Sequence, residues 1–128
     1  MQATKAEERA RLLAGRLEEA GYTVKVTVHE RPAELFSTGR VMSGKTTYVS
    51  VYAVGPNVLD DTYGFSFVTR ERSEYARAST AFVAAHMYRA TGKTRSRKMT
   101  LRQLRDRIAS EVDSARYSAE YAAGRATS

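Results

Sequence analysis

The sequence predicts one α+β domain, in which helices pack on a three-stranded antiparallel sheet in the order α-β-β-β-α-α. Apolar residues recur at three- and four-residue steps near both ends of the chain, which is typical of amphipathic helices. In the middle they recur at every second residue, which is typical of half-buried strands, and the short connections there favour antiparallel pairing. With 128 residues the chain has the length of one domain, which we expect at 1–123, with a frayed tail at 124–128.

The first helix is expected to begin at Thr4. Thr4-Lys5-Ala6-Glu7 fits a capping box, in which the side chains of the first and last residue each accept a hydrogen bond from an unpaired backbone amide. One apolar stripe then follows helical spacing: Ala6, Ala10, Leu13, Leu17 and Ala20. Gly21 supplies the left-handed residue that ends a helix.

Three strands are expected next. Val24, Val26 and Val28 alternate with polar residues until Pro32, and a polar loop at 33–45 follows. The second strand covers 46–54, where valine and alanine alternate with tyrosine and serine, and the third covers 63–69.

Two further helices are predicted. The first begins at Thr69 or Ser73 and reaches about Thr91, and because it is apolar nearly all round we expect it to be the most buried helix. A linker at 93–98 leads to a second capping box, Thr100-Leu101-Arg102-Gln103. An apolar stripe from Leu101 to Ala122 continues that last helix.

The order of the first five predicted elements, α-β-β-β-α, is similar to that of the double-stranded RNA-binding domain. The resemblance is one of order alone. That family has a basic cluster at the start of its second helix, whereas this chain has Ser73-Glu74-Tyr75-Ala76 there.

Composition excludes several kinds of site. The chain has no cysteine, so disulfides, thiolate nucleophiles and cysteine-based zinc sites are ruled out. Its first residues are polar and charged, unlike a signal peptide, and its longest apolar run, Ala81 to Met87, is too short to span a bilayer. We therefore expect a cytoplasmic protein that does not act on membranes.

The net charge of +7 is concentrated in one segment. Eight of the 21 cations and one of the 14 acids lie between Arg89 and Arg107, so this segment carries a formal +7 and the rest of the chain is neutral. Such a localised field attracts polyanions, and arginine can donate two hydrogen bonds to a phosphate. We predict phosphate contacts from seven of these residues and from two in the preceding loop: Arg89, Lys93, Arg95, Arg97, Lys98, Arg102, Arg105, Arg40 and Lys45.

Residues Gly39 to Thr46 match the spacing G-x-x-x-x-G-K-[ST] of a phosphate-binding P-loop. A P-loop lies between a strand and a helix, so that backbone amides at the start of the helix surround the phosphates. Here the residues after Thr46 have the pattern of a strand. We therefore interpret this segment as a basic loop, and we expect no cofactor.

Aromatic residues in the predicted sheet could stack on unpaired bases or could form the core. Because they are wholly apolar, Phe65 and Phe67 are expected in the core, whereas Tyr48 and Tyr52 are the better candidates for exposure. The two histidines, His29 on the polar side of a strand and His86 within the predicted buried helix, have no partners at ligand spacing, so no metal site is expected.

The leading hypothesis is a small, basic, non-catalytic nucleic-acid-binding accessory protein that binds DNA or RNA, of a size and composition suited to a bacterium, phage or mobile element. A second is a protein-interaction module, such as an inhibitor, adaptor or virion assembly factor. It would act, or form a homodimer, through the last helix with Tyr117 and Tyr121. A third is a small basic ribonuclease that uses Arg, Tyr and Lys.

Overall fold

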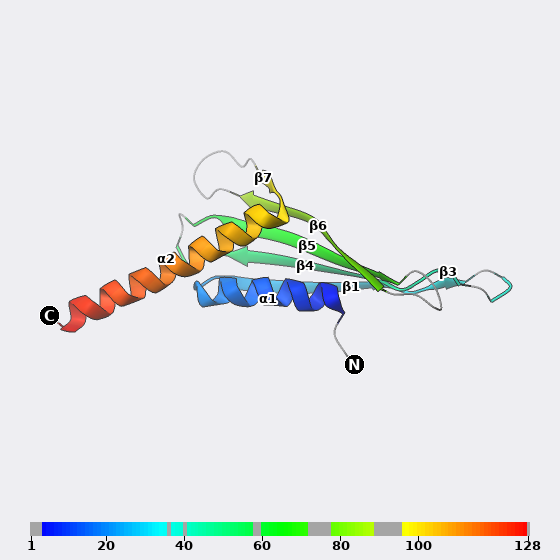
Figure 1. Ribbon diagram of the computed structural model, residues 1–128, viewed down its shortest axis with the longest axis horizontal. Helices are drawn as coiled ribbons and strands as arrows, with labels where there is room; N and C mark the ends of the chain where they lie inside the picture. The colour runs from blue at the N-terminus through cyan, green and yellow to red at the C-terminus, as the bar shows by residue number, and fades with distance from the viewer. Residues whose placement is uncertain are drawn as a thin grey trace.

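The described residues form two helices and a five-stranded antiparallel sheet, with a separate two-stranded hairpin. The computed structural model describes residues 4–35, 37–39, 41–57, 60–71, 78–88 and 96–127. The strand order in the sheet is β1 (Thr23–Arg31), β4 (Thr46–Val54), β5 (Thr62–Glu71), β6 (Ala78–Tyr88) and β7 (Ser96–Met99). Strands that follow one another along the chain therefore lie side by side once the hairpin is left out. Both helices cover the same face of the sheet (Figure 1).

The first helix, α1 (Lys5–Glu19), is confirmed. The hydroxyl of Thr4 accepts a hydrogen bond from the backbone N–H of Glu7 at 3.3 Å, as the capping box predicts. The backbone N–H of Ala6 donates to the Thr69 hydroxyl of the sheet at 2.9 Å, which ties the start of the helix to the strand beneath it. Gly21, with φ of 92°, follows the helix, and the predicted apolar stripe is buried as far as Leu17.

The three predicted strands are confirmed as β1 (Thr23–Arg31), β4 (Thr46–Val54) and β5 (Thr62–Glu71). Their alternation places one residue in two against the helices. Val51 of β4 lies opposite both Val26 and Phe65, and together these pairs continue the core across three strands. The aromatic core is completed by Phe67, whose ring meets that of Phe82 edge-on at a centroid distance of 5.7 Å.

The predicted helix at about 73–91 is wrong, because residues Ala78–Tyr88 form strand β6. A β-bulge hides the strand pattern: Ser66 pairs with Ala84 but Phe67 pairs with Phe82, which leaves Val83 without a partner on β5. The extra residue shifts the alternation by one position. Apolar residues therefore occupy both odd and even positions of this segment. In the sequence this pattern resembles that of a helix that is apolar on all sides. Residues 72–77 and 89–95 lie outside the described part of the chain.

Two more segments are strands where none is predicted. The expected loop at 33–45 contains the hairpin of β2 (Glu34–Leu35) and β3 (Val41–Ser43), which extends beyond the sheet as an arm (Figure 1). The expected linker contributes β7 (Ser96–Met99), which pairs with the end of β6. The order is therefore not that of the double-stranded RNA-binding domain, and the three-stranded sheet with three helices is replaced by five strands and two helices.

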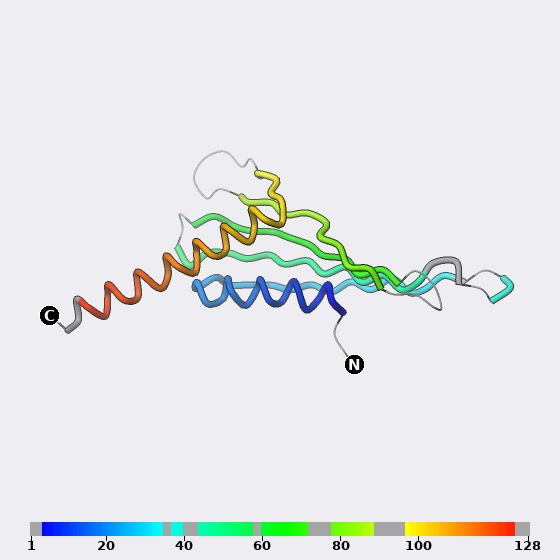
Figure 2. The backbone as a smooth tube through the Cα atoms, in the orientation of Figure 1, coloured from blue at the N-terminus to red at the C-terminus, as the bar shows by residue number. Residues whose placement is uncertain are grey.

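The last predicted helix is confirmed as α2 (Leu101–Thr127), which includes residues 124–127 of the predicted tail. Its capping box is reciprocal, since Gln103 N–H donates to the Thr100 hydroxyl at 3.1 Å and Thr100 N–H donates to the Gln103 side chain at 2.9 Å. Leu104, Ile108 and Val112 bury its inner face. The C-terminal part of α2 continues past the end of the sheet (Figure 2).

A polar network attaches α2 to the sheet. The buried Tyr63 hydroxyl accepts a hydrogen bond from Arg107 Nε at 3.1 Å and donates one to Glu111 Oε1 at 3.1 Å. Arg107 also forms an ion pair with Asp61 at 3.0 Å. Burial raises the pKa of Tyr63 to about 12, and it raises the pKa of the neighbouring Tyr22 as well.

These raised pKa values predict a loss of stability at alkaline pH. On unfolding, both phenols return to a pKa of about 10, so their contribution is complete below about pH 10 and is lost as the pH rises through about 12 for Tyr63. The free energy of unfolding, measured by urea titration, should therefore fall over this interval. Tyr63→Phe should make the fall shallower, and an equally steep fall in that variant would contradict the assignment.

Candidate nucleic-acid interface

Four residues of the predicted phosphate-binding set lie around one edge of the sheet. Arg97 and Lys98 belong to the edge strand β7, and Arg102 and Arg105 to the first turns of α2, which begins two residues after β7 ends. All four are exposed, and none forms an ion pair with another described residue. Four further members lie outside the described residues: Arg89, Lys93, Arg95 and Arg40.

Two other cations in or near the predicted site are paired with carboxylates. Arg107, the last residue of the basic segment, is paired with Asp61 and lies 4.0 Å from Glu111. Lys45 Nζ lies 3.2 Å from Glu30 Oε1, although both side chains remain substantially exposed. Exposed pairs of this kind contribute little and exchange readily with other anions. The unpaired charge of the described basic segment is therefore that of Arg97, Lys98, Arg102 and Arg105.

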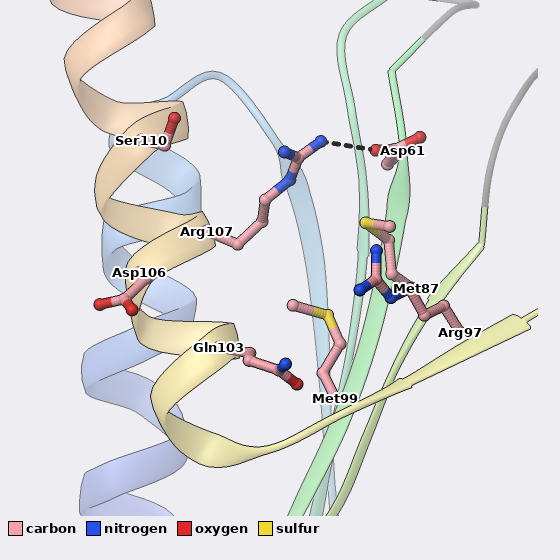
Figure 3. A pocket seen from close by; sticks show the side chains of 8 residues that line it. All are labelled: Asp61, Met87, Arg97, Met99, Gln103, Asp106, Arg107 and Ser110. Atoms are coloured by element: carbon pink, nitrogen blue, oxygen red, sulfur yellow. Dashed lines mark hydrogen bonds and ion pairs between the residues drawn. The ribbon is translucent and has the colours of Figure 1, made fainter.

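These four cations do not share one face. Neighbouring residues of a strand point to opposite sides, and Arg97 pairs with the buried Met87 on the helix side. There it lines a cleft of about 590 Å³ together with Met87 and Arg107. Figure 3 shows Arg97 and Met87 side by side on the strand side of this cleft and Arg107 reaching across from α2 to Asp61. Lys98 pairs with His86 and lies on the opposite face.

The face of the sheet opposite the helices, called the open face below, is covered by no described helix or strand, and it is mostly polar. It contains a groove of about 550 Å³ over β1, β4, β5 and β6, lined among others by Lys25, Ser50, Tyr52, Gly64 and His86. The hydroxyls of Ser50 and Ser66 lie 3.1 Å apart on its floor. This face offers hydroxyl, imidazole and ammonium groups to a ligand.

The aromatic residues divide between the two faces as predicted. Phe65 and Phe67 are buried in the core, whereas Tyr48 is half-buried and Tyr52 is 52% exposed on the open face. His86 does not lie in a buried helix as predicted, because strand β6 places it half-buried on the open face. No group of three His, Cys, Asp or Glu side chains among the described residues could hold a metal ion.

Three residues of the open face have no place in the predicted site: Lys25, Gly64 and Tyr88. Lys25 has a signal in the sequence, since it alternates with the apolar residues of the first strand. Tyr88 could not be assigned to this face from the sequence, because its segment is predicted to be a helix. The position of Gly64 becomes apparent only from the pairing of the strands, which places it opposite Tyr52 of β4 on one side and His86 of β6 on the other.

The segment that matches the P-loop spacing does not have the strand–loop–helix arrangement of a P-loop. Gly39, with φ of 85°, lies in the hairpin arm, and the segment then continues along β3 into β4 with no helix after it. Position 44 requires glycine because the backbone of Glu71 passes close to it, and a Cβ on residue 44 would overlap the Glu71 carbonyl. Glu71 N–H donates to the Lys45 carbonyl at 3.0 Å, and so holds the two chains together at this point.

Comparison with protein families, with curated proteins and with solved structures finds no match to this chain. Within the described residues, neither helix is long and apolar enough to cross a membrane.

Replacing Gly44 tests its structural role. Gly44→Ala should lower the free energy of unfolding by about 1–3 kcal/mol, because backbone must move to admit the methyl group. Lys45→Ala should cost less than about 1 kcal/mol, since it removes only an exposed ion pair. Urea titration of both variants measures the free energy of unfolding. Equal stability of the Gly44→Ala variant and the unmodified protein would show that the Glu71 backbone does not lie against position 44.

Proposed function

We propose that this protein binds nucleic acid without catalysis. The observation that carries the proposal is the group of four exposed cations around the β7 edge, Arg97, Lys98, Arg102 and Arg105, which have no carboxylate partner among the described residues. Desolvated or paired cations contribute little to long-range attraction, whereas unpaired cations on one edge raise the local concentration of polyanions.

Nucleic acid fits these cations better than a small anion does. The four residues point to both faces of the sheet and along α2, so one phosphate cannot contact all of them. A chain of phosphates that passes around the edge can. Arg89, Lys93 and Arg95 precede these residues in the sequence and belong to the same proposed contact set. Arg40, which lies outside the described residues, and Lys45, which directly precedes β4, are proposed as a second, weaker contact.

A protein-interaction role is the second candidate, and the C-terminal part of α2 favours it. After Ala115 the side chains of this helix are exposed from Arg116 to Glu120, and Tyr117 is 70% exposed. A helix with this much exposed surface is available to a groove on another protein. Light scattering would detect a homodimer, and one that Tyr117→Ala dissolves would favour this role.

Charge removal tests the nucleic-acid proposal. A variant with glutamine at Arg97, Lys98, Arg102 and Arg105 should bind oligonucleotides more weakly, whatever their sequence. The slope of log K against log salt should become shallower by about 3 to 4, because four phosphate contacts are lost. Fluorescence anisotropy at several salt concentrations measures both quantities.

The matched control replaces four exposed cations of α1 with glutamine: Lys5, Arg9, Arg11 and Arg16. It lowers the net charge by the same amount at a different place. The control should retain most of the affinity. If both variants lose the same affinity, only overall charge matters, and if the unmodified protein binds no oligonucleotide at low salt, the proposed function is wrong.

A further inference from the structure

We infer that the open face of the sheet binds the unpaired bases of a single-stranded nucleic acid. This inference rests on the proposed function and adds to it the strandedness of the ligand and the surface that holds its bases. It depends on one row of side chains that crosses all five strands, which the register of the sheet defines. The row consists of Lys25, Tyr52, Gly64, His86 and Lys98, one residue from each strand in spatial order.

The dimensions of the row suit a short stretch of single strand. Neighbouring strands lie about 4.8 Å apart, so Lys25 and Lys98 are separated by roughly 19 Å at the backbone. The open sheet of a common RNA-binding module, which has one strand fewer, stacks about two or three bases. A cation stands at each end of this row, where a phosphate backbone that crosses the sheet would enter and leave.

The middle of the row can hold a flat ring. Tyr52 and His86 flank Gly64, which contributes no side chain and so leaves a hollow between them. The ring of Tyr88 comes within 3.9 Å of the position that a Gly64 Cβ would occupy, so a third aromatic group lies beside Gly64. Bases stack on aromatic side chains whatever their sequence, and each stacked base contributes substantially to affinity.

A duplex fits this face less well. Its bases are already stacked on one another, so the exposed ring of Tyr52 would gain nothing from them. A second copy of the chain fits less well too. The row has a lysine at each end and no acidic residue, so a copy packed face to face would bury like charges together. Charge and ring chemistry therefore favour a polyanion with accessible bases.

Anisotropy titrations with labelled oligothymidine, oligouridine and a duplex of equal length test the inference. The single strands should bind more tightly than the duplex, and the comparison of the first two shows whether DNA or RNA is preferred. Tyr52→Ala should weaken single-strand binding about 5- to 150-fold through the loss of one stacked base. Tyr117→Ala, which removes an exposed tyrosine from α2, should leave it unchanged.

Two adjacent lysine and arginine positions supply the matched control for the cations. Lys98→Gln and Arg97→Gln each remove one positive charge from β7, but only Lys98 lies on the open face. Lys98→Gln should weaken single-strand binding more. Gly64→Val should also weaken it, because the side chain fills the hollow while a β-branched residue suits a strand. Circular dichroism shows whether each variant remains folded.

The outcomes separate the two proposals. Tighter binding of the duplex, or equal effects of Tyr52→Ala and Tyr117→Ala, would overturn the inference and leave the proposed function in place. The same holds if Arg97→Gln weakens single-strand binding as much as Lys98→Gln does. Absence of binding to all three oligonucleotides would overturn both. A dimer that Tyr52→Ala dissolves, without oligonucleotide binding, would assign the face to a second copy instead.

Discussion

The structure depends on one constraint: successive residues of a strand point to opposite faces, and both helices pack on the same face. Tyr63, Phe65 and Phe67 must therefore lie beneath α1 and α2, where they form the core. The residues between them must face away. The sheet is consequently apolar on one side and carries hydroxyl, imidazole, phenol and ammonium groups on the other. The core and the proposed base-binding surface thus lie on opposite faces of the sheet.

Local signals were enough to predict α1, α2 and three strands. The capping boxes at Thr4 and Thr100 act through residues three positions apart, so they can be read without tertiary structure. Strand β6 could not be predicted in this way. Its bulge at Val83 removes the strict alternation, and its alanines favour a helix until pairing with β5 decides otherwise. The short strands β2, β3 and β7 hold too few residues to show a period.

The candidate site was predictable in its residue types and not in its arrangement. Alternation in one strand was sufficient to place Tyr52 outside and its neighbours inside. The row from Lys25 to Lys98 requires the register of four strand pairs, two of which involve strands that the sequence pattern missed. For the same reason the basic segment predicted as one surface has Arg97 and Lys98 on opposite faces. The sequence therefore gives the number of charges in this segment, whereas the pairing of the strands determines the face of the sheet on which each charge lies.

The most direct test of the proposed binding face is an NMR titration of the isotope-labelled protein with oligothymidine. It measures the change in the chemical shift of each backbone amide. The account predicts that the largest changes fall on residues of the open face, with Tyr52, Gly64 and Lys98 at their centre, while buried positions of α1 and α2 change little. Changes concentrated on the helices, with the amides of the open face unmoved, would contradict it.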